Sequence, residues 1–464
     1  MSILTEKKTE ENLRSSVNPL HGSLWDKILR FSIPLAVTGI LQQLFNAADT
    51  VVVGQFAGKN AMAAVGSDGP VISILVNLFI GLSVGANVVI ANCVGRGDNA
   101  ETNKSIHTSV FVGLACGLFI MIVGLAFSAP LLNMMSVPHD IHDMALLYLR
   151  LYFTGMPFIM MYNFESAIFR SQGNTRTPLA VLTISGILNI GLNLLFVLLL
   201  GMDVAGVALA TVISNAASSA ILFSILVKHK GPTQLKIREM RFNMRYFNGI
   251  LRIGLPAGIQ SMVFSVSNLL IQSSVNQLGT DAMAATTAAL NYEIIVYYMI
   301  TSFSQTCVTF TGQNYGAGNI SRCRRTARLS MLMGIIFTSV ISLAFIIFAE
   351  PALRLFSSDP RVIALGTIRI RYIIGLEVMC VVYEVISGAL RGFGYSMMPA
   401  LITCLGVCVF RVAWVYTVFP HHRSLSTLVY SYPISWFLTA AILLLVYPVI
   451  IRRIENSPET VMRR

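Results

Sequence analysis

Charged side chains are scarce in this sequence. Of its 464 residues, 12% are charged and 55% are apolar, whereas an ordinary soluble protein is about 25% charged. The shortage excludes a water-soluble enzyme of ordinary composition. A membrane-spanning helix needs about 20 mostly apolar residues, so the composition favours a polytopic membrane protein. The seven cysteines are scattered, and no disulfide framework is expected from them.

Motifs of catalysis and nucleotide binding are also missing. The glycine-rich run at 312–318 is not followed by the lysine and hydroxyl residue of a phosphate-binding loop. The sequence contains neither a nucleophile elbow nor a zinc helix with two histidines. We therefore expect no enzyme, no organic cofactor and no metal apart from Na⁺, with an ion gradient as the source of energy.

Twelve apolar runs predict twelve transmembrane helices. They lie near residues 29–53, 69–94, 106–128, 144–168, 178–200, 204–227, 250–277, 285–312, 328–349, 363–389, 396–418 and 426–451. Of the 33 Lys and Arg residues, 25 fall on the side that both tails share, four on the other side and four within the runs. This bias predicts cytoplasmic termini. It also explains the net charge of +12 without a nucleic-acid partner.

The chain repeats itself. The segment 29–34 recurs at 251–256 with a shift of 222, and 61–64 recurs at 282–285 with a shift of 221. The predicted fold class is therefore an all-α polytopic membrane protein with two pseudo-symmetric six-helix lobes, as in transporters built from parallel repeats. Its predicted parts are a cytoplasmic tail (1–28), an N-lobe (29–227), a cytoplasmic linker (228–249), a C-lobe (250–451) and a second cytoplasmic tail (452–464).

Polar side chains in the first repeat predict an ion site. Asp49 lies near the end of the first run, Asn189 and Asn193 lie four apart on the fifth, and Thr211 lies on the sixth. Residues three or four apart share a helix face, so these side chains can converge. Burial disfavours an ionised carboxylate and a bound Na⁺ favours it, so Asp49 can exchange a proton or Na⁺ for cargo. The alternative is hydrogen bonding that only holds the helices together.

Asp49 belongs to one repeat only, because Ile271 stands at the matching position of the second. That repeat has its own polar set, which predicts either a structural ion pair or a site for cationic substrates. Its members are Tyr292, Glu293, Tyr297, Tyr298, Glu377, Glu384 and Arg411. By depth, the best predicted partner of Arg411 is Glu293, followed by Glu377. Glu165 and Glu384 are expected to reach water at the cytoplasmic ends.

Together these features resemble the multidrug and toxic compound extrusion (MATE) transporters. The resemblance covers residues 25–452 and rests on Pro34, Asn46-Ala47-Ala48-Asp49-Thr50, Asn189 with Asn193, the run 206–211, the run 313–318 and Leu390-Arg391-Gly392. It implies two lobes in a V around a central cavity. It also implies an antiporter of the cell inner membrane, working as a monomer, that exports cationic amphiphilic compounds in exchange for H⁺ or Na⁺ by alternating access.

The resemblance also implies ligands for the ion. In family members with a cation site in the N-lobe, the ligands match Asp49, Asn189 and Thr211, and a second aspartate often stands where this chain has Asn193. The C-lobe carboxylates of the sodium-coupled branch align with Phe264 and Cys380, which carry no carboxylate.

Two alternatives stay open. A lipid-linked saccharide flippase of the same superfamily needs several basic side chains that face the cavity, and only Arg411 lies deep inside a predicted span. A membrane-embedded transferase needs a nucleophile, a histidine or paired aspartates at one membrane face. Its only candidates are His139 with Asp140 and His142 with Asp143, in a short loop.

Overall fold

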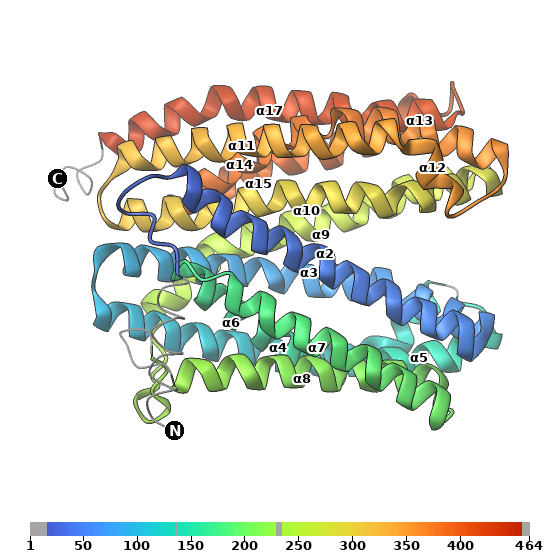
Figure 1. Ribbon diagram of the computed structural model, residues 1–464, viewed down its shortest axis with the longest axis horizontal. Helices are drawn as coiled ribbons and strands as arrows, with labels where there is room; N and C mark the ends of the chain where they lie inside the picture. Colours follow the sequence, from blue (N-terminus) through green and yellow to red (C-terminus); the bar gives the residue numbers. More distant parts are fainter. Residues whose placement is uncertain (1–15, 136, 229–233, 457–464) are drawn as a thin grey trace. The chain divides into compact units, whose positions relative to one another are not determined.

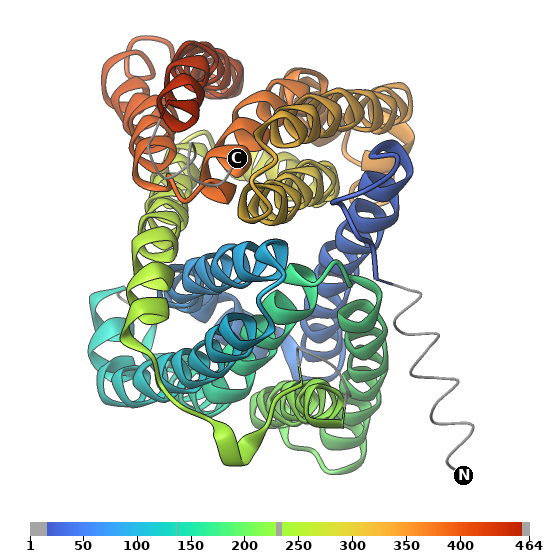
Figure 2. The same cartoon turned by 90° about the vertical axis from the view of Figure 1, so that its left-hand side faces the viewer.

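Helices make up the regular structure of the described residues. The computed structural model describes residues 16–135, 137–228 and 234–456 (Figures 1 and 2). The first half contains α2 (Trp25–Val52), the π-helical turn η1 (Val53–Ala57), α3 (Gly58–Arg96), α4 (Asn99–Met134), α5 (His139–Thr154), α6 (Met156–Ser171), α7 (Arg176–Leu194), the π-helical turn η2 (Leu195–Leu199), α8 (Asp203–Lys228), the 3-10 turn η3 (Ile237–Glu239) and α9 (Met244–Asn276).

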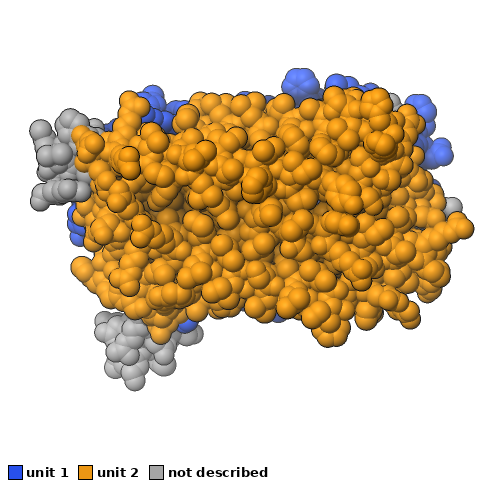
Figure 3. All heavy atoms as spheres, turned by 90° about the horizontal axis from the view of Figure 1, so that it is seen from above, with its two compact units in different colours: residues 1–18, 37–258 blue, residues 19–36, 259–464 orange. Residues whose placement is uncertain are grey.

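The second half contains α10 (Thr280–Gly316), α11 (Ile320–Ile347), α12 (Ala349–Arg354), α13 (Pro360–Leu376), α14 (Val378–Gly392), α15 (Met397–Thr403), the π-helical turn η4 (Cys404–Val409), α16 (Phe410–Thr417) and α17 (Leu425–Glu455). Two compact units divide the chain, coloured separately in Figure 3. Unit 1 comprises Met1–Asn18 and Val37–Gly258, and unit 2 comprises Pro19–Ala36 and Ile259–Arg464. The boundaries fall inside α2 and α9, a few residues after Pro34 and Pro256.

Most of these helices are long and apolar enough to cross a membrane. Among the described residues nine meet that test alone, and two bent pairs, α5 with α6 and α13 with α14, bring the number to eleven. The remaining predicted run, 285–312, lies within α10, which is long but carries many hydroxyl and amide side chains. The chain is thus an all-α, multi-pass membrane protein.

The repeat reappears in the way the helices end. Gly97 closes α3 with a φ of +72°, and Asp98 then caps α4 by accepting a hydrogen bond from the Glu101 amide at 3.0 Å. Its counterpart in the second half has Gly318 at a φ of +76°, followed by an asparagine cap on α11. Only glycine adopts such positive φ values without strain, so the repeated glycines mark the same turn twice.

A close helix crossing in unit 1 depends on four glycines. Gly81 and Gly85 lie four apart on α3, and Gly254 and Gly258 lie four apart on α9. A Cβ atom on Gly81 would lie 2.2 Å from the backbone nitrogen of Gly258, and one on Gly85 would lie 2.4 Å from the Ile250 carbonyl oxygen. Small residues at this spacing let two membrane helices pack backbone against backbone.

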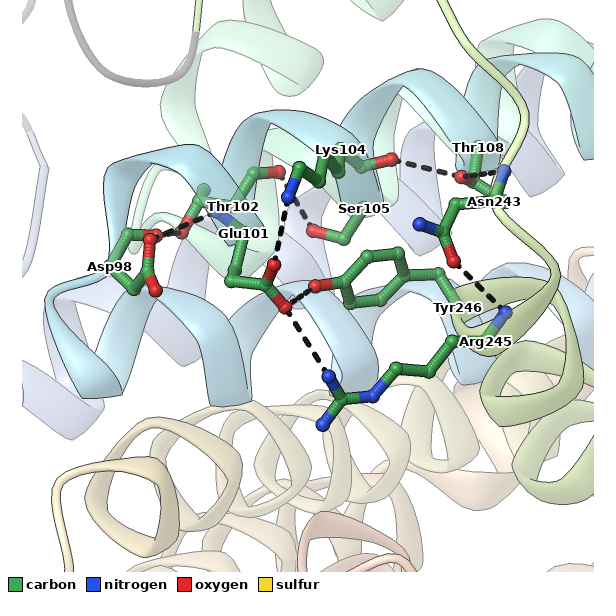
Figure 4. A network of polar contacts seen from close by, with 9 residues as sticks. All are labelled: Asp98, Glu101, Thr102, Lys104, Ser105, Thr108, Asn243, Arg245 and Tyr246. Atoms are coloured by element: carbon green, nitrogen blue, oxygen red, sulfur yellow. Dashed lines mark hydrogen bonds and ion pairs between the residues drawn. The ribbon is translucent and has the colours of Figure 1, made fainter.

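Polar contacts hold Asn243 and the first turn of α9 against the start of α4, within unit 1 (Figure 4). The Tyr246 hydroxyl donates to Glu101, whose carboxylate also lies 3.8 Å from Arg245. The backbone N–H of Asn243 donates to the Thr108 hydroxyl at 3.2 Å. These bonds give the predicted linker 228–249 a defined path, apart from residues 229–233, which lie outside the described residues.

Candidate ion-binding site

Asp49 on α2 meets side chains from α7 and α8. The Asn193 amide nitrogen donates to Asp49 Oδ1 at 2.5 Å, and the Thr211 hydroxyl donates to Asp49 Oδ2 at 3.3 Å. The same Asn193 nitrogen donates to Asn189 Oδ1 at 3.2 Å. Three helices of unit 1 therefore meet at one carboxylate. The structure brings the four predicted side chains together, and their role in ion coupling stays a prediction.

Neutral donors surround the Asp49 carboxylate. Among the described residues no lysine, arginine or histidine forms an ion pair with it. The Asn193 side-chain oxygen is buried and has no hydrogen-bond partner there. A carboxylate, two amide oxygens and a hydroxyl oxygen are the ligands that hard cations such as Na⁺ prefer. For a proton, the carboxylate alone suffices. The cluster therefore suits either ion.

Two π-helical turns lie directly beyond this cluster. The turn η1 begins four residues after Asp49, η2 begins two residues after Asn193, and the two turns contact each other. Such turns widen the helix by one residue and often occur at functional sites. They interrupt the regular backbone bonding of α2 and α7 next to the residues that meet.

The charged cluster of unit 2 differs from the predicted one. Arg369 on α13 forms two hydrogen bonds with Glu293 on α10, at 2.6 and 2.8 Å, and both side chains are buried. The predicted pairing of Arg411 with Glu293 is therefore wrong. It is wrong because α10 packs against α13, which places Arg369 opposite Glu293, whereas α16, which carries Arg411, packs against α17.

Arg411 instead contacts hydroxyl and aromatic groups of α17. Its Nε donates to Ser435 Oγ at 3.0 Å, and its guanidinium carbon lies 4.0 Å from the centre of the Tyr432 ring and 5.5 Å from that of Trp436. Glu377 lies at the bend between α13 and α14, within electrostatic range of Arg369 and Arg411, and among the described residues it forms no ion pair with either. Cation–π contacts thus replace the expected carboxylate partner of Arg411.

The other residues of this set do not form one site. The Tyr292 hydroxyl donates to the Ala352 carbonyl at 2.9 Å, and its ring packs against Phe345 and Phe356. Tyr297 is 40% exposed and lies within electrostatic range of Glu384 and Glu377, but no hydrogen bond joins it to either in the described residues. Glu384 lies further along α14, within electrostatic range of Arg391.

Glu165 and Glu384 were expected to reach water, but both are buried. Glu165 is 0% exposed, and one of its oxygens accepts a hydrogen bond from Ser219 at 3.3 Å. Glu384 is also buried. The chain bends by 45° between α5 and α6, and α6 packs against α3, α4 and α8. This packing encloses Glu165 inside unit 1, so the prediction for both glutamates is corrected.

Two buried charged residues were missed as site candidates. Arg369 lies within the predicted span 363–389, and no partner was predicted for it. Asp68 was placed just before the second predicted span, at 69–94, whereas α3 begins at Gly58 and buries Asp68 completely. The apolar residues at 61–65 are the signal that could have extended the span to include it.

A multi-pass helical membrane protein with two repeated halves and ionisable side chains within its membrane-spanning helices has the features of a membrane transporter. Residues 34–195 and 256–417 match the family model described as MatE. The two matches cover most of the chain, which therefore belongs to the MatE family. Members of this family are transporters, which implies that the chain is not an enzyme.

Curated relatives carry transporter names. The chain is 28% identical over 396 residues to the "Probable multidrug resistance protein NorM" of Thermotoga maritima, covering 83% of this chain and 84% of the relative. It is 26% identical to the "Probable multidrug resistance protein YoeA" of Bacillus subtilis, covering 92% and 93%. It is also 26% identical to a "FAD transporter" of Shewanella oneidensis, covering 72% and 75%.

Solved structures have the same fold. A structure described as the "Outward-facing conformation of a multidrug resistance MATE family transporter of the MOP superfamily" matches with a TM-score of 0.88 at 23% identity. A transporter of that superfamily from Pyrococcus furiosus matches with the same score and identity. Each match covers 95% of this chain and 99% of the other. The chain thus has the two-lobe fold of MATE transporters.

Proposed function

We propose that this chain exports organic cations in antiport with H⁺ or Na⁺ by alternating access. The observation that carries the proposal is the Asp49 carboxylate, which is bound by Asn193 and Thr211 and has no basic partner among the described residues. A partly buried acid without a counter-charge is costly within the membrane-spanning part of a protein. An ion that enters and leaves the site removes that cost in one state of the cycle and restores it in the other.

A proton on Asp49 reverses the direction of hydrogen bonding. The ionised carboxylate accepts from Asn193 and Thr211, whereas a protonated carboxyl donates from one oxygen. The Thr211 hydroxyl oxygen can accept this hydrogen bond from Oδ2. At Oδ1 the Asn193 amide nitrogen cannot accept one, but the unpaired Asn193 oxygen can if the amide group rotates. This rotation of the Asn193 side-chain amide breaks its hydrogen bond to Asn189. Protonation thus changes the bonding between α2 and α7, and this biases the unit toward a second conformation.

Cationic amphiphilic compounds are the proposed cargo, and the multidrug names of the relatives support that class. The "FAD transporter" among the relatives is named for a different cargo. We also propose that the protein acts as a monomer in the cell inner membrane with both termini in the cytoplasm. The excess of basic residues on the side of the two tails supports this orientation.

Transport in liposomes tests the proposal. Purified protein is reconstituted, and ethidium efflux is followed under a pH gradient or a sodium gradient, each imposed alone. We expect one of the two gradients to drive efflux. The Asp49→Asn variant keeps the size and polarity of the side chain but cannot bind a proton, and we expect at least a tenfold loss of gradient-driven efflux.

A matched control tests whether the loss of efflux is specific to Asp49 or follows from replacing any aspartate of unit 1. Asp143 lies in the same unit with an exposed side chain, so Asp143→Asn should transport ethidium at the wild-type rate. A well-folded Asp49→Asn protein that still couples efflux to the gradient contradicts the proposed role of Asp49. Wild-type protein that responds to neither gradient contradicts the proposed function itself.

A further inference from the structure

Asp68 is a fully buried acid in unit 1 that does not belong to the Asp49 cluster. Its side chain is 0% exposed, and neither carboxylate oxygen has a hydrogen-bond partner among the described residues. It lies on the membrane-spanning helix α3. An ionised carboxylate without a partner is disfavoured by several kcal/mol in such a place, so Asp68 is expected to carry a proton or to bind a cation.

The surroundings of Asp68 suit a proton rather than Na⁺. The residues one turn away on the same face of α3 are apolar: Ala64, Val65, Val71 and Ile72, all of which pack in the core clusters of unit 1. Na⁺ needs several oxygen ligands as a hard cation, whereas a proton needs only the carboxylate.

Tyr148 on α5 adds to these apolar surroundings, because α5 packs against α3 and Tyr148 is buried in the core cluster against which Val65 packs. Its ring stacks on Tyr152 with the ring centres 6.1 Å apart. The helices α4, α6 and α8 pack against α3 as well, and within the described part of the chain no ion pair joins Asp68 to a charged group.

The repeat shows that the fold does not need an acid here. Asp68 follows Ala64 by four residues, and the shift of 221 places Ala289 at the matching position of the second repeat. Ala289 is fully buried in α10. One fold therefore contains an alanine at this position in one half and an acid in the other, so packing alone does not account for Asp68.

We propose that Asp68 is a second proton-carrying residue of unit 1, which binds and releases a proton in the same transport cycle as Asp49. The Asp68 carboxyl releases its proton to water on one side of the membrane, and the carboxylate takes up another proton from the other side. This inference rests on the proposed antiport and adds that two protons, rather than one, move for each ethidium-like cation.

The ethidium gradient at which net flux stops gives the number of protons. With the membrane potential held at zero, a pH difference of one unit balances about a 10-fold cargo gradient for one proton and about a 100-fold gradient for two. We expect about 100-fold for wild type and for the control Asp143→Asn. We expect about 10-fold for Asp68→Asn and for Asp68→Ala, which copies the residue of the other repeat.

The outcomes separate this inference from the proposed function. If wild type transports under a gradient but balances only about 10-fold per pH unit, or if both Asp68 variants match wild type, the two-proton inference is overturned. If wild type transports under no gradient, the proposed function fails.

Infrared spectroscopy provides a test that does not need transport, in case both Asp68 variants fold poorly. In Asp49→Asn protein with isotope-labelled aspartate, exposed aspartates are ionised in neutral buffer. A carboxylic-acid band that persists there is expected from Asp68, and its absence overturns the inference.

Discussion

Two acids, Glu293 in unit 2 and Asp49 in unit 1, differ in the partners that surround them. In unit 2 the buried acid Glu293 has a basic partner, since Arg369 binds both of its oxygens. In unit 1 Asp49 has only neutral donors, and Asp68 has no hydrogen-bond partner in the described segments. An acid that is already neutralised by arginine gains little from another cation, whereas one bound by amides and hydroxyls gains a great deal. The comparison therefore supports the proposal that ion exchange takes place in unit 1.

Breaking the Glu293–Arg369 pair is expected to have the largest effect. Glu293→Gln leaves the Arg369 charge buried without a partner, which should lower stability by about 3–5 kcal/mol. The double variant Glu293→Gln with Arg369→Gln should recover much of this loss, because no charge remains. Thermal unfolding of the detergent-extracted protein measures both changes.

The exposed pair Glu350–Arg354, at 2.7 Å in the same unit, is the matched control. Its Glu350→Gln variant should change stability little, since water solvates the charge that is left. Equal losses in the single and double variants of the buried pair would show that Arg369 does not need its partner, and the contrast between the units would disappear.

Arg411 sharpens the comparison because it is a buried base whose contacts are a hydroxyl and two aromatic rings. Arg411→Leu removes these contacts and should lower stability by about 1–2 kcal/mol. The same unfolding measurement made with Glu377→Gln and with the double variant tests for a hidden pair. Additive losses are expected, since no ion pair joins the two residues. A large coupling energy in this cycle would instead identify Glu377 as the partner of Arg411.

The smallest effect is expected at the edge of the Asp49 cluster. Thr211→Val removes the longer of the two hydrogen bonds to Asp49. A lost hydrogen bond of about 1 kcal/mol corresponds to about a 5-fold change in the half-saturating concentration of the coupling ion. Ethidium efflux measured against pH or sodium concentration gives this value.

Thr183→Val is the control, because Thr183 donates only to the Leu179 carbonyl of its own helix among the described contacts. It should leave the ion dependence unchanged. An equal shift in both variants would mean that loss of any helix hydroxyl in unit 1 has the same effect, and Thr211 would no longer count as a ligand.

The sequence was sufficient to predict the helices and the meeting of Asp49, Asn193 and Thr211. Apolar runs identify spans, and residues three or four apart share a face, so polar side chains on three neighbouring helices of one repeat have few other places to point. The repeat was equally informative, because the same glycine turn ends α3 and α10 at matching positions.

The partners of buried charges were not predictable in the same way. A span gives the depth of a side chain along its helix but not the rotation of that helix against its neighbours. The bends of 45° between α5 and α6 and 42° between α13 and α14 change both depth and direction beyond the break. Glu165, Arg369 and Glu377 lie on these bent pairs or at their junction, and the surroundings of two of them, Glu165 and Arg369, were predicted wrongly or missed.

The glycine crossing of α3 and α9 limits how this chain can change during evolution. At Gly81, Gly85, Gly254 and Gly258 an added methyl group would meet main-chain atoms, which cannot rotate aside as a side chain does. Selection must keep these positions small whatever compound is carried. Four residues without any functional group are therefore under a constraint as strict as that on an ion ligand, and the reason is the space between two helices.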